Sequence, residues 1–238
     1  MGQVLNFFPL TIFKSTINLK NKKKNKMVEE IFTMEKKSKN IDYKNQSSAW
    51  TGDTQGFEYI HNNPIFDDFL LEVKKAIIEY LNVLEIDHNQ LEIFIQRSWA
   101  TISIGNERIK KHRHFQSHIS FAYYLKKNKQ DSNFVVFDES YKNEIMTGIF
   151  RSDTALQKGI VKKMNQFNVT QAIVNIEEDD IIIFPSKTLH GTQKNINNND
   201  RISISADVSI LAKESKNLEH LTPCLLYTSP SPRDGLLS

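Results

Sequence analysis

The stretch Ile119–Leu125 reads Ile-Ser-Phe-Ala-Tyr-Tyr-Leu and is the part of the sequence that most constrains the fold. Successive side chains of a β-strand point to opposite faces, so the stretch divides into two sets of residues. One set is bulky (Ile119, Phe121, Tyr123 and Leu125) and the other is Ser120, Ala122 and Tyr124. Small residues followed by a tyrosine that can donate a hydrogen bond suit the wall of a ligand cavity. The stretch is therefore predicted to be a strand with one face lining such a cavity.

The same period of two residues extends over the surrounding sequence from Leu91 onward. Candidate strands are 91–104, 110–115, 119–125, 134–138, 171–176, 180–184, 189–194 and 201–210. Short strands with polar breaks between them predict a mainly β (α+β) protein whose core, residues 91–211, is a barrel or a two-sheet jelly roll. The gap 139–170 is too long for a hairpin loop, so we expect an insertion that acts as a lid or binding loop.

The residues before this core indicate helical structure. Asn63-Pro64 supplies an N-cap and a proline at the first helical position, and apolar residues then recur at steps of three and four up to Leu84. Residues 46–90 are therefore predicted to be a helical cover for the sheet. Residues 1–45 are predicted to hold a strand at 7–13 and a lysine-rich arm with one helix near 28–36.

Composition excludes several classes of protein. The 238 residues are 39% hydrophobic and 25% charged, as in ordinary globular proteins. No apolar run reaches the roughly 20 residues that a membrane span needs, and the apolar start has no basic region before it, so neither a span nor a signal peptide is expected. Five lysines between Lys20 and Lys26 lack the interleaved aromatic residues of a base-stacking surface, so we expect a solvated segment rather than a nucleic-acid site.

The last seventeen residues differ in character from the rest. The chain becomes rich in Pro and Ser from Thr222, after a region rich in Asn, Lys and Ile, and it resembles translated adapter sequence. We therefore expect 222–238 to be a non-native tail. Cys224, the only cysteine, lies in it, which fits a cytoplasmic protein without disulfides.

Two short motifs are candidates for metal binding. His112 and His114 are separated by one residue, so in a strand both imidazoles reach the same point, and His190 follows the buried strand that ends at Pro185. Imidazole ligands suit Fe, Zn, Cu or Ni. For the His-x-His pair alone, two polar strand residues are the simpler interpretation.

The strand that begins at Arg201 indicates an anion site. Arg201, Ser203 and Ser205 share one face of it. An arginine that points into a barrel needs an anionic partner, and a carboxylate bound by both guanidinium nitrogens, with a hydroxyl donor from Ser203, is the natural one. For Arg201 taken alone, a surface arginine at the start of a strand is the simpler interpretation.

The order of these motifs resembles that of the Fe(II)/2-oxoglutarate-dependent oxygenases of the double-stranded β-helix fold. The matching elements are His-x-His, a strand ending in Tyr-Tyr-Leu, Phe-Pro followed by His, and Arg-x-Ser. The similarity is greatest to phage- and bacterial-type oxygenases and more distant to prolyl hydroxylases, and it runs from Phe7 to about Ser209.

The resemblance implies the activity and the roles of the residues. His112, His114 and His190 would bind Fe(II), while Arg201, Ser203 and Tyr124 would hold the distal carboxylate of the co-substrate 2-oxoglutarate. The implied reaction consumes O2 and 2-oxoglutarate, releases succinate and CO2, and oxidises, most simply by hydroxylation, a small-molecule or peptidyl substrate. Contacts within 139–170 are expected to select that substrate, which the sequence does not identify.

Two departures from the family pattern leave alternatives open. Most of the superfamily has a carboxylate where this chain has His114, so Asp138 or Glu139 could supply the third ligand instead, and Asp179 stands where glycine is common. A cupin-type three-His metalloprotein that does not use 2-oxoglutarate, either a dioxygenase or an isomerase, fits the histidines equally well. A non-enzymatic β-barrel binding module would need neither the histidines nor Arg201.

Overall fold

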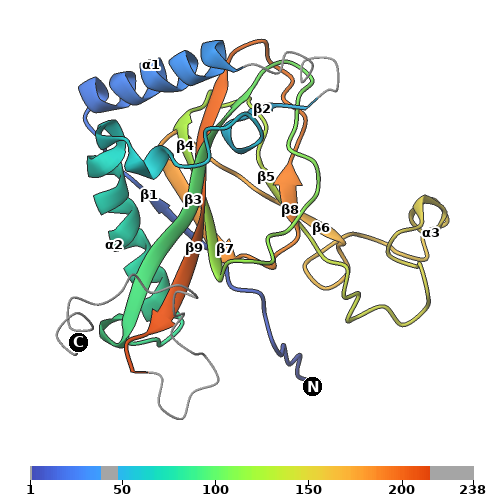
Figure 1. Cartoon of the computed structure of the whole chain (residues 1–238). Helices are drawn as coiled ribbons and strands as arrows, with labels where there is room; N and C mark the ends of the chain where they lie inside the picture. Colours follow the sequence, from blue (N-terminus) through green and yellow to red (C-terminus); the bar gives the residue numbers. More distant parts are fainter. Residues whose placement is uncertain (1, 39–47, 215–238) are drawn as a thin grey trace, which may run out of the picture.

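The computed structural model describes residues 2–38 and 48–214. The strands of this part of the chain are β1 (Phe13–Thr16), β2 (Trp50–Thr51), β3 (Leu91–Ser103), β4 (Ile119–Lys126), β5 (Phe134–Phe137), β6 (Gln171–Val174), β7 (Asp180–Pro185), β8 (His190–Thr192) and β9 (Arg201–Ala212). They form two antiparallel sheets, one with the order β1-β7-β4-β9-β3-β2 and the other with the order β6-β5-β8 (Figure 1).

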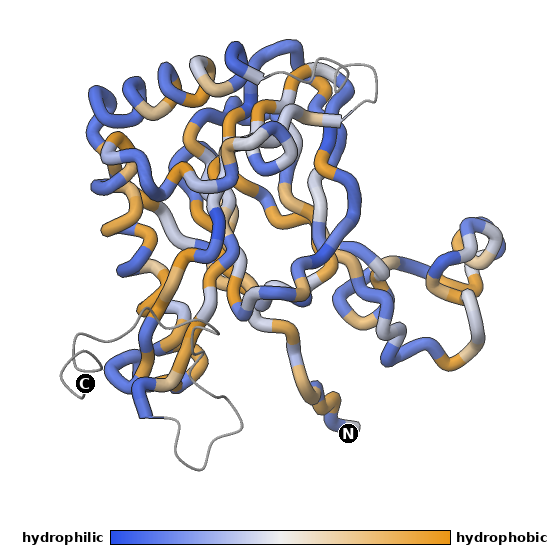
Figure 2. Tube along the Cα trace, in the orientation of Figure 1, coloured by the Kyte–Doolittle hydropathy of each residue, from blue (hydrophilic) through white to orange (hydrophobic). Residues whose placement is uncertain are grey.

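Two long helices pack on the larger sheet. The helices are α1 (Asn21–Lys37), α2 (Asp67–Val83) and the short α3 (Asp153–Gln157), with 3-10 turns at Gly52–Thr54, Ile60–Asn62, Pro64–Phe66 and His88–Gln90. Apolar side chains of α1, α2 and the six-stranded sheet form one buried cluster, and the tube of α2 alternates between apolar and polar residues (Figure 2). Figure 1 shows α3 standing apart from both sheets. None of the helices in the described residues is long and apolar enough to span a membrane.

The alternation along β4 separates the core from a second, smaller apolar cluster. Phe121 and Tyr123 belong to the large cluster that includes the helices. Tyr124, from the opposite face, packs instead with Phe134 and Phe184, residues that come from both sheets. The predicted two-faced strand is confirmed, because its bulky face enters the core and its other face lines a cavity.

The N-terminal predictions need correction. Residues 7–10 form no strand; the strand begins at Phe13 and pairs with β7, while the Phe8 side chain is 85% exposed. The lysine-rich segment is helical rather than a loop, because it forms the first half of α1. Four of its five lysines are exposed, as expected, whereas Lys24 falls at helical spacing with the buried residues Met27 and Ile31.

Lys24 is itself buried and ties α1 to the turn before β7. Its ammonium lies 2.7 Å from a carboxylate oxygen of Glu178 and 2.8 Å from one of Asp179. Asp179 has a φ of 70°, in the left-handed region that glycine adopts freely. The departure from glycine is thus accommodated by an aspartate that also accepts a hydrogen bond from the Tyr123 hydroxyl at 2.7 Å.

The remaining element predictions agree with the structure except at one place. Residues 110–115 are not a strand and make a single antiparallel bridge, between His112 and His190. Insertion 139–170 contains α3 and otherwise no helix or strand. The expected tail, 222–238, lies outside the described residues, as do residues 39–47.

Substituting Phe69 tests the packing of α2 on the sheet. The Phe69 side chain is 1% exposed, and its ring centroid lies 4.8 Å from that of Tyr123. We expect Phe69→Ala to lower the free energy of unfolding by about 3–5 kcal/mol, because the lost contacts leave a cavity. Urea unfolding followed by fluorescence measures this, with Leu71→Ala, at a 60% exposed position of the same helix, as a control expected to change little. A loss below about 1 kcal/mol for Phe69→Ala would contradict this packing.

Candidate active site

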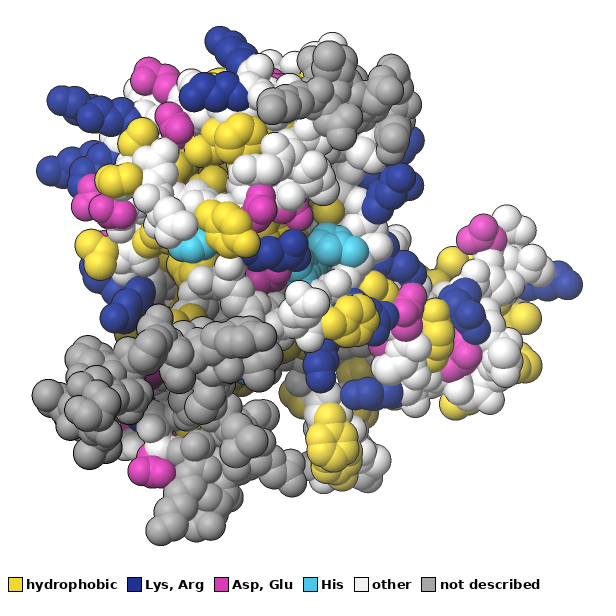
Figure 3. Space-filling view, viewed as in Figure 1, with side chains coloured by type: hydrophobic (Ala, Val, Ile, Leu, Met, Phe, Trp, Pro, Cys, Tyr) yellow, Lys and Arg dark blue, Asp and Glu magenta, His cyan; other side chains and the backbone are white. Residues whose placement is uncertain are grey.

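Every residue that the sequence assigned to the site lines one cavity. The cavity has a volume of about 840 Å³ and is bordered by strands of both sheets. His112, His114, His190, Arg201, Ser203 and Tyr124 all contribute to its wall. The molecular surface viewed in Figure 3 shows histidine atoms exposed beside acidic and basic side chains.

The backbone brings the three histidines together from distant parts of the sequence. His112 and His190 exchange two backbone hydrogen bonds, each 2.9 Å long, and the backbone N–H of His114 donates to the carbonyl of Ser186 at 2.9 Å. The His-x-His segment is thus hydrogen-bonded to Ser186, in the loop before β8, and to His190, the first residue of β8. These bonds explain why the imidazoles of His112 and His114 reach the same point, as predicted, although the segment is not a strand.

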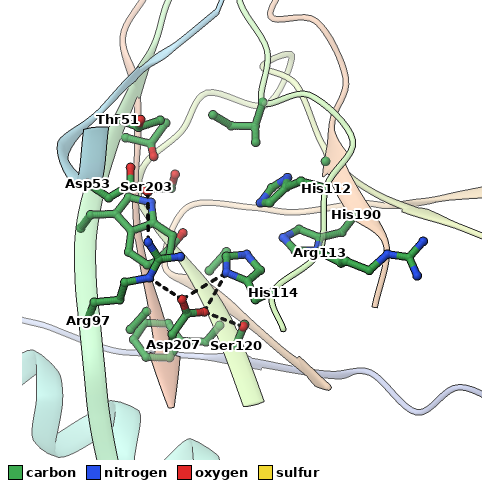
Figure 4. Close-up of a pocket in the computed structure, with 18 of the residues that line it drawn as sticks. Thr51, Asp53, Arg97, His112, Arg113, His114, Ser120, His190, Ser203 and Asp207 are labelled. Carbon is green, nitrogen blue, oxygen red and sulfur yellow. Dashed lines mark hydrogen bonds and ion pairs between the residues drawn. The ribbon is translucent and has the colours of Figure 1, made fainter. Parts of the chain in front are cut away.

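The imidazole rings present one nitrogen each toward a common point. Their candidate ligand atoms all lie within 4.8 Å of one another (Figure 4). In each ring, Nδ1 is occupied by an acceptor: the carbonyl of Lys110 at 2.8 Å from His112, the carbonyl of Thr188 at 2.8 Å from His190, and the Asp207 carboxylate at 2.9 Å from His114. A proton on Nδ1 leaves the lone pair on Nε2. The arrangement therefore fits a metal ion held through three Nε2 atoms.

Burial keeps the rings of His112 and His190 neutral. Burial, together with the neighbouring His112, lowers the pKa of His190 to about 3. Burial likewise lowers the pKa of His112. Metal ligation requires a deprotonated ring nitrogen, so both residues are ready to ligate at neutral pH.

Asp207 is a site residue that the sequence interpretation missed. Its carboxylate accepts from Arg97 Nε at 2.7 Å and from Ser120 Oγ at 3.0 Å, besides contacting His114. Burial would raise the pKa of this carboxyl, but His114 and Arg97 outweigh burial and hold it at about 2. Trp99 stacks on the His114 ring with centroids 5.9 Å apart and lies beneath the Arg97 guanidinium.

Arg201 is a buried cation with little compensation from the protein. Its side chain is 1% exposed, and Nη1 donates to the carbonyl of Ser132 at 3.2 Å. Its Nε has no hydrogen-bond partner, and among the described residues no carboxylate forms an ion pair with it. Burial lowers the pKa of this guanidinium. Burial also raises the pKa of Tyr124 to about 12, and the centre of the Tyr124 ring lies 5.6 Å from the guanidinium carbon. Such a group calls for an anion from outside the protein.

The two carboxylates considered as alternatives to His114 face elsewhere. Glu139 is paired with Lys111 at 2.7 Å and with Arg113 at 2.8 Å, and Asp138 accepts hydrogen bonds from Ser140. Neither belongs to the cavity wall, nor does any other residue of 139–170. In this structure the insertion therefore does not close over the cavity, contrary to the lid expected from its length.

The mouth of the cavity is formed by a segment that the sequence did not single out. Thr51, Asp53 and Tyr59 lie before α2, and Phe115 and Gln116 follow the His-x-His pair. Asp53 has one carboxylate oxygen 3.8 Å from Arg97 and the other buried without a partner. The pairing of β2 with β3 brings Thr51 and Asp53 to the cavity, and a bridge to Ser98 places Tyr59.

Comparison with known proteins agrees with this geometry. A family model described as "Putative 2OG-Fe(II) oxygenase" matches residues 97–207, which span the three histidines, Arg201 and Asp207. A search of curated proteins found no match.

Solved structures share the fold at low sequence identity. HygX from Streptomyces hygroscopicus, crystallised with nickel and 2-oxoglutarate, is 10% identical with a TM-score of 0.53 over 84% of this chain and 83% of its own. SnoN, the non-heme alpha ketoglutarate dependent epimerase from nogalamycin biosynthesis, is 8% identical with a TM-score of 0.54 over 87% and 82%. AviO1 from Streptomyces viridochromogenes is 10% identical with a TM-score of 0.50 over 84% and 90%. Residues 97–207, which contain the three histidines and Arg201, are therefore similar to the 2OG-Fe(II) oxygenases, a family whose members use Fe(II), 2-oxoglutarate and O2.

Proposed function

We propose that this protein is an Fe(II)- and 2-oxoglutarate-dependent dioxygenase, acting as a hydroxylase, in a double-stranded β-helix built from the two sheets. The observation that carries this proposal is the pairing of two features in one cavity. Three imidazoles converge there with their Nε2 atoms free, and a fully buried guanidinium has an unused donor. A metal alone would account for the histidines, but only an anionic co-substrate accounts for Arg201 as well.

His112, His114 and His190 would hold the iron. All three would do so as neutral donors, which leaves coordination positions open for the co-substrate and O2. When bound, Fe(II) supplies the redox chemistry that couples oxidative decarboxylation of 2-oxoglutarate to oxidation of the substrate, with succinate and CO2 as co-products. The apolar rings of Phe134 and Phe184, with centroids 5.5 and 4.6 Å from that of His190, exclude water from this end of the cavity.

Arg201 would bind the distal carboxylate of 2-oxoglutarate. In the β3–β9–β4 register Ser203 lies opposite both Thr101 and Tyr124, so two hydroxyl groups face the cavity next to the one of Ser203. These hydroxyls would donate hydrogen bonds to the lone pairs of the carboxylate oxygens that the guanidinium leaves without a donor. The co-substrate would thereby repay the cost of burying Arg201.

The prime substrate would enter over Asp53 and Tyr59. This end of the cavity offers a partly buried carboxylate with an open acceptor and an exposed phenol, next to the aromatic ring of Phe115. We infer a small-molecule or peptidyl substrate that donates hydrogen bonds to Asp53. Its specificity would depend on this rim rather than on residues 139–170.

An anaerobic titration tests the proposal. Fe(II) followed by 2-oxoglutarate is added to the full chain while the visible spectrum is recorded. We expect a weak charge-transfer band that appears only when both are present. Fe(II) binding without the band would overturn the 2-oxoglutarate assignment and favour a three-His metalloprotein of the cupin type. A folded protein that binds no Fe(II) would overturn the metal site itself.

A further inference from the structure

One of the three histidines of the site, His114, is hydrogen-bonded to a buried carboxylate, that of Asp207. In the more common arrangement with two histidines and one carboxylate, the acidic ligand both fixes the geometry and lowers the net charge of the metal centre. Here His114 stands at that position, and Asp207 lies directly behind it, with its oxygens 2.9 and 3.2 Å from Nδ1 of His114 (Figure 4).

Asp207 lies within the larger sheet, on β9 between β3 and β4. In the strand register Asp207 of β9 stands opposite Arg97 of β3 on one side and Ser120 of β4 on the other. Both neighbours donate hydrogen bonds to it, at 2.7 and 3.0 Å. With two donors from adjacent strands and a side chain only 4% exposed, the carboxylate has no freedom to turn away from His114.

The His114 ring is also fixed on its face. Trp99 stacks on it at an interplanar angle of 24°, and the Arg97 guanidinium lies 4.9 Å from the centre of the Trp99 ring while binding Asp207. Arg97, Trp99 and Asp207 thus form one support for His114, which the other two histidines lack, since their Nδ1 atoms meet backbone carbonyls.

We propose that Asp207 is a positioning residue that takes the place of the missing carboxylate ligand. It fixes His114 with Nε2 toward the metal, and it passes negative charge to the metal through the imidazole, since a carboxylate that accepts from Nδ1–H makes the ring a stronger donor. Arg97, with Nε 2.7 Å from Asp207, offsets part of this charge, but its side chain is 42% exposed to water, whereas Asp207 and His114 are enclosed. The inference rests on the proposed function.

The test compares Asp207→Asn with Asp200→Asn. Asparagine keeps the size of the side chain, and its amide oxygen can still accept from His114 and Arg97 as Oδ2 of Asp207 does. The charge is lost, and the amide NH2 takes the place of the oxygen that accepts from Ser120, whose hydroxyl can turn to accept instead. Asp200 lies one residue before β9 on the surface, where it is 37% exposed and 3.7 Å from Lys126, so its substitution removes the same charge away from the site. Co(II), added alone to the full-length proteins, serves as the probe.

We expect Asp207→Asn to weaken Co(II) binding by about 10- to 100-fold and Asp200→Asn to leave it unchanged. At saturating metal, the Co(II) d–d bands should shift in Asp207→Asn only. In the iron-loaded protein, its Fe(III)/Fe(II) midpoint potential should rise, because the oxidised metal loses a nearby negative charge. A residue that served only to hold the sheet together would move neither the bands nor the potential.

The outcomes separate the two levels of the argument. If the wild-type chain binds Co(II) and the charge-transfer band forms, but Asp207→Asn matches it in affinity, bands and potential, the role of Asp207 is overturned while the proposed function stands. Loss of thermal stability in the metal-free variant with unchanged metal properties would likewise reduce Asp207 to a structural residue. If the wild-type chain binds no metal, the proposed function fails first.

Discussion

Arg201→Met will abolish 2-oxoglutarate binding while leaving the protein folded. Removal of one partner from a buried charge pair costs about 3–5 kcal/mol, which corresponds to a loss of affinity of roughly 100- to 1000-fold or more. Methionine fills much of the arginine volume with apolar atoms, so the site should not collapse. Isothermal titration of 2-oxoglutarate into the anaerobic Fe(II)-loaded protein measures the loss.

The same substitution should have the opposite effect on the protein without co-substrate. Arg201 is 1% exposed, donates one hydrogen bond through Nη1, and has an Nε without a partner. Replacing such a group with an apolar side chain is often neutral or stabilising by about 1–4 kcal/mol. We therefore expect the metal-free Arg201→Met protein to unfold at the same urea concentration as the wild type or at a higher one.

A matched control is Arg108→Met, since Arg108 is exposed and outside the cavity wall. It should leave both 2-oxoglutarate affinity and unfolding unchanged. If Arg201→Met binds 2-oxoglutarate as tightly as Arg108→Met does, the carboxylate clamp is assigned to the wrong residue. Strong destabilisation of the apo protein would instead show that Arg201 is compensated within the protein.

The strands that build the cavity could be predicted because their two faces differ. In β4, bulky and small side chains alternate, and the structure places Tyr123 in the core and Tyr124 at the cavity. The face of β9 that carries Arg201 and Ser203 could be predicted from the same alternation. A period of two is a local property, and the larger antiparallel sheet packs one face against α1 and α2 while its other face lines the cavity.

Long-range contacts explain what the sequence did not reveal. The lysine cluster at the start of α1 was predicted to be solvated, and four of its five lysines are exposed, but Lys24 is buried and pairs with Glu178 and Asp179, more than 150 residues away. The segment around His112 was predicted to be a strand, but its backbone bonds are divided between His190 and Ser186. Neither partner can be inferred from local periodicity.

Asp207 was missed although a local signal for it existed. It continues the alternation Arg201, Ser203, Ser205 and is therefore on the same face of β9, where an acidic residue stands out among hydroxyl groups. The residues at the mouth gave no such signal. Asp53 lies in a 3-10 turn whose place beside the site depends on the short strand β2 and its pairing with β3.

His190→Ala will remove the response of the protein to metal. At a Co(II) concentration of about 100 times Kd, binding stabilises the wild type by about 2.7 kcal/mol, which raises Tm by roughly 5–10 °C for a domain of this size. His190 supplies one of three converging ring nitrogens, and its ring is 7% exposed between Phe134 and Phe184, so no water-exposed group can replace it. Thermal melts with and without Co(II) should therefore show a shift for the wild type and none for the variant.

Reading the difference between the two melts separates ligation from packing. Loss of the imidazole also removes packing against Phe184, so the metal-free variant is expected to melt below the wild type, and only the increment caused by Co(II) reports on the site. His88→Ala is the control, because His88 is half-buried in the turn before β3, outside the cavity wall, and should keep the full increment. Equal increments in His190→Ala and His88→Ala would mean that Co(II) binds elsewhere, and the triad would then be wrong. If His190→Ala loses the Co(II)-induced rise in Tm and His88→Ala keeps it, the buried imidazoles are the ligands. Each variant lacks one histidine, and only His190 lies in the cavity.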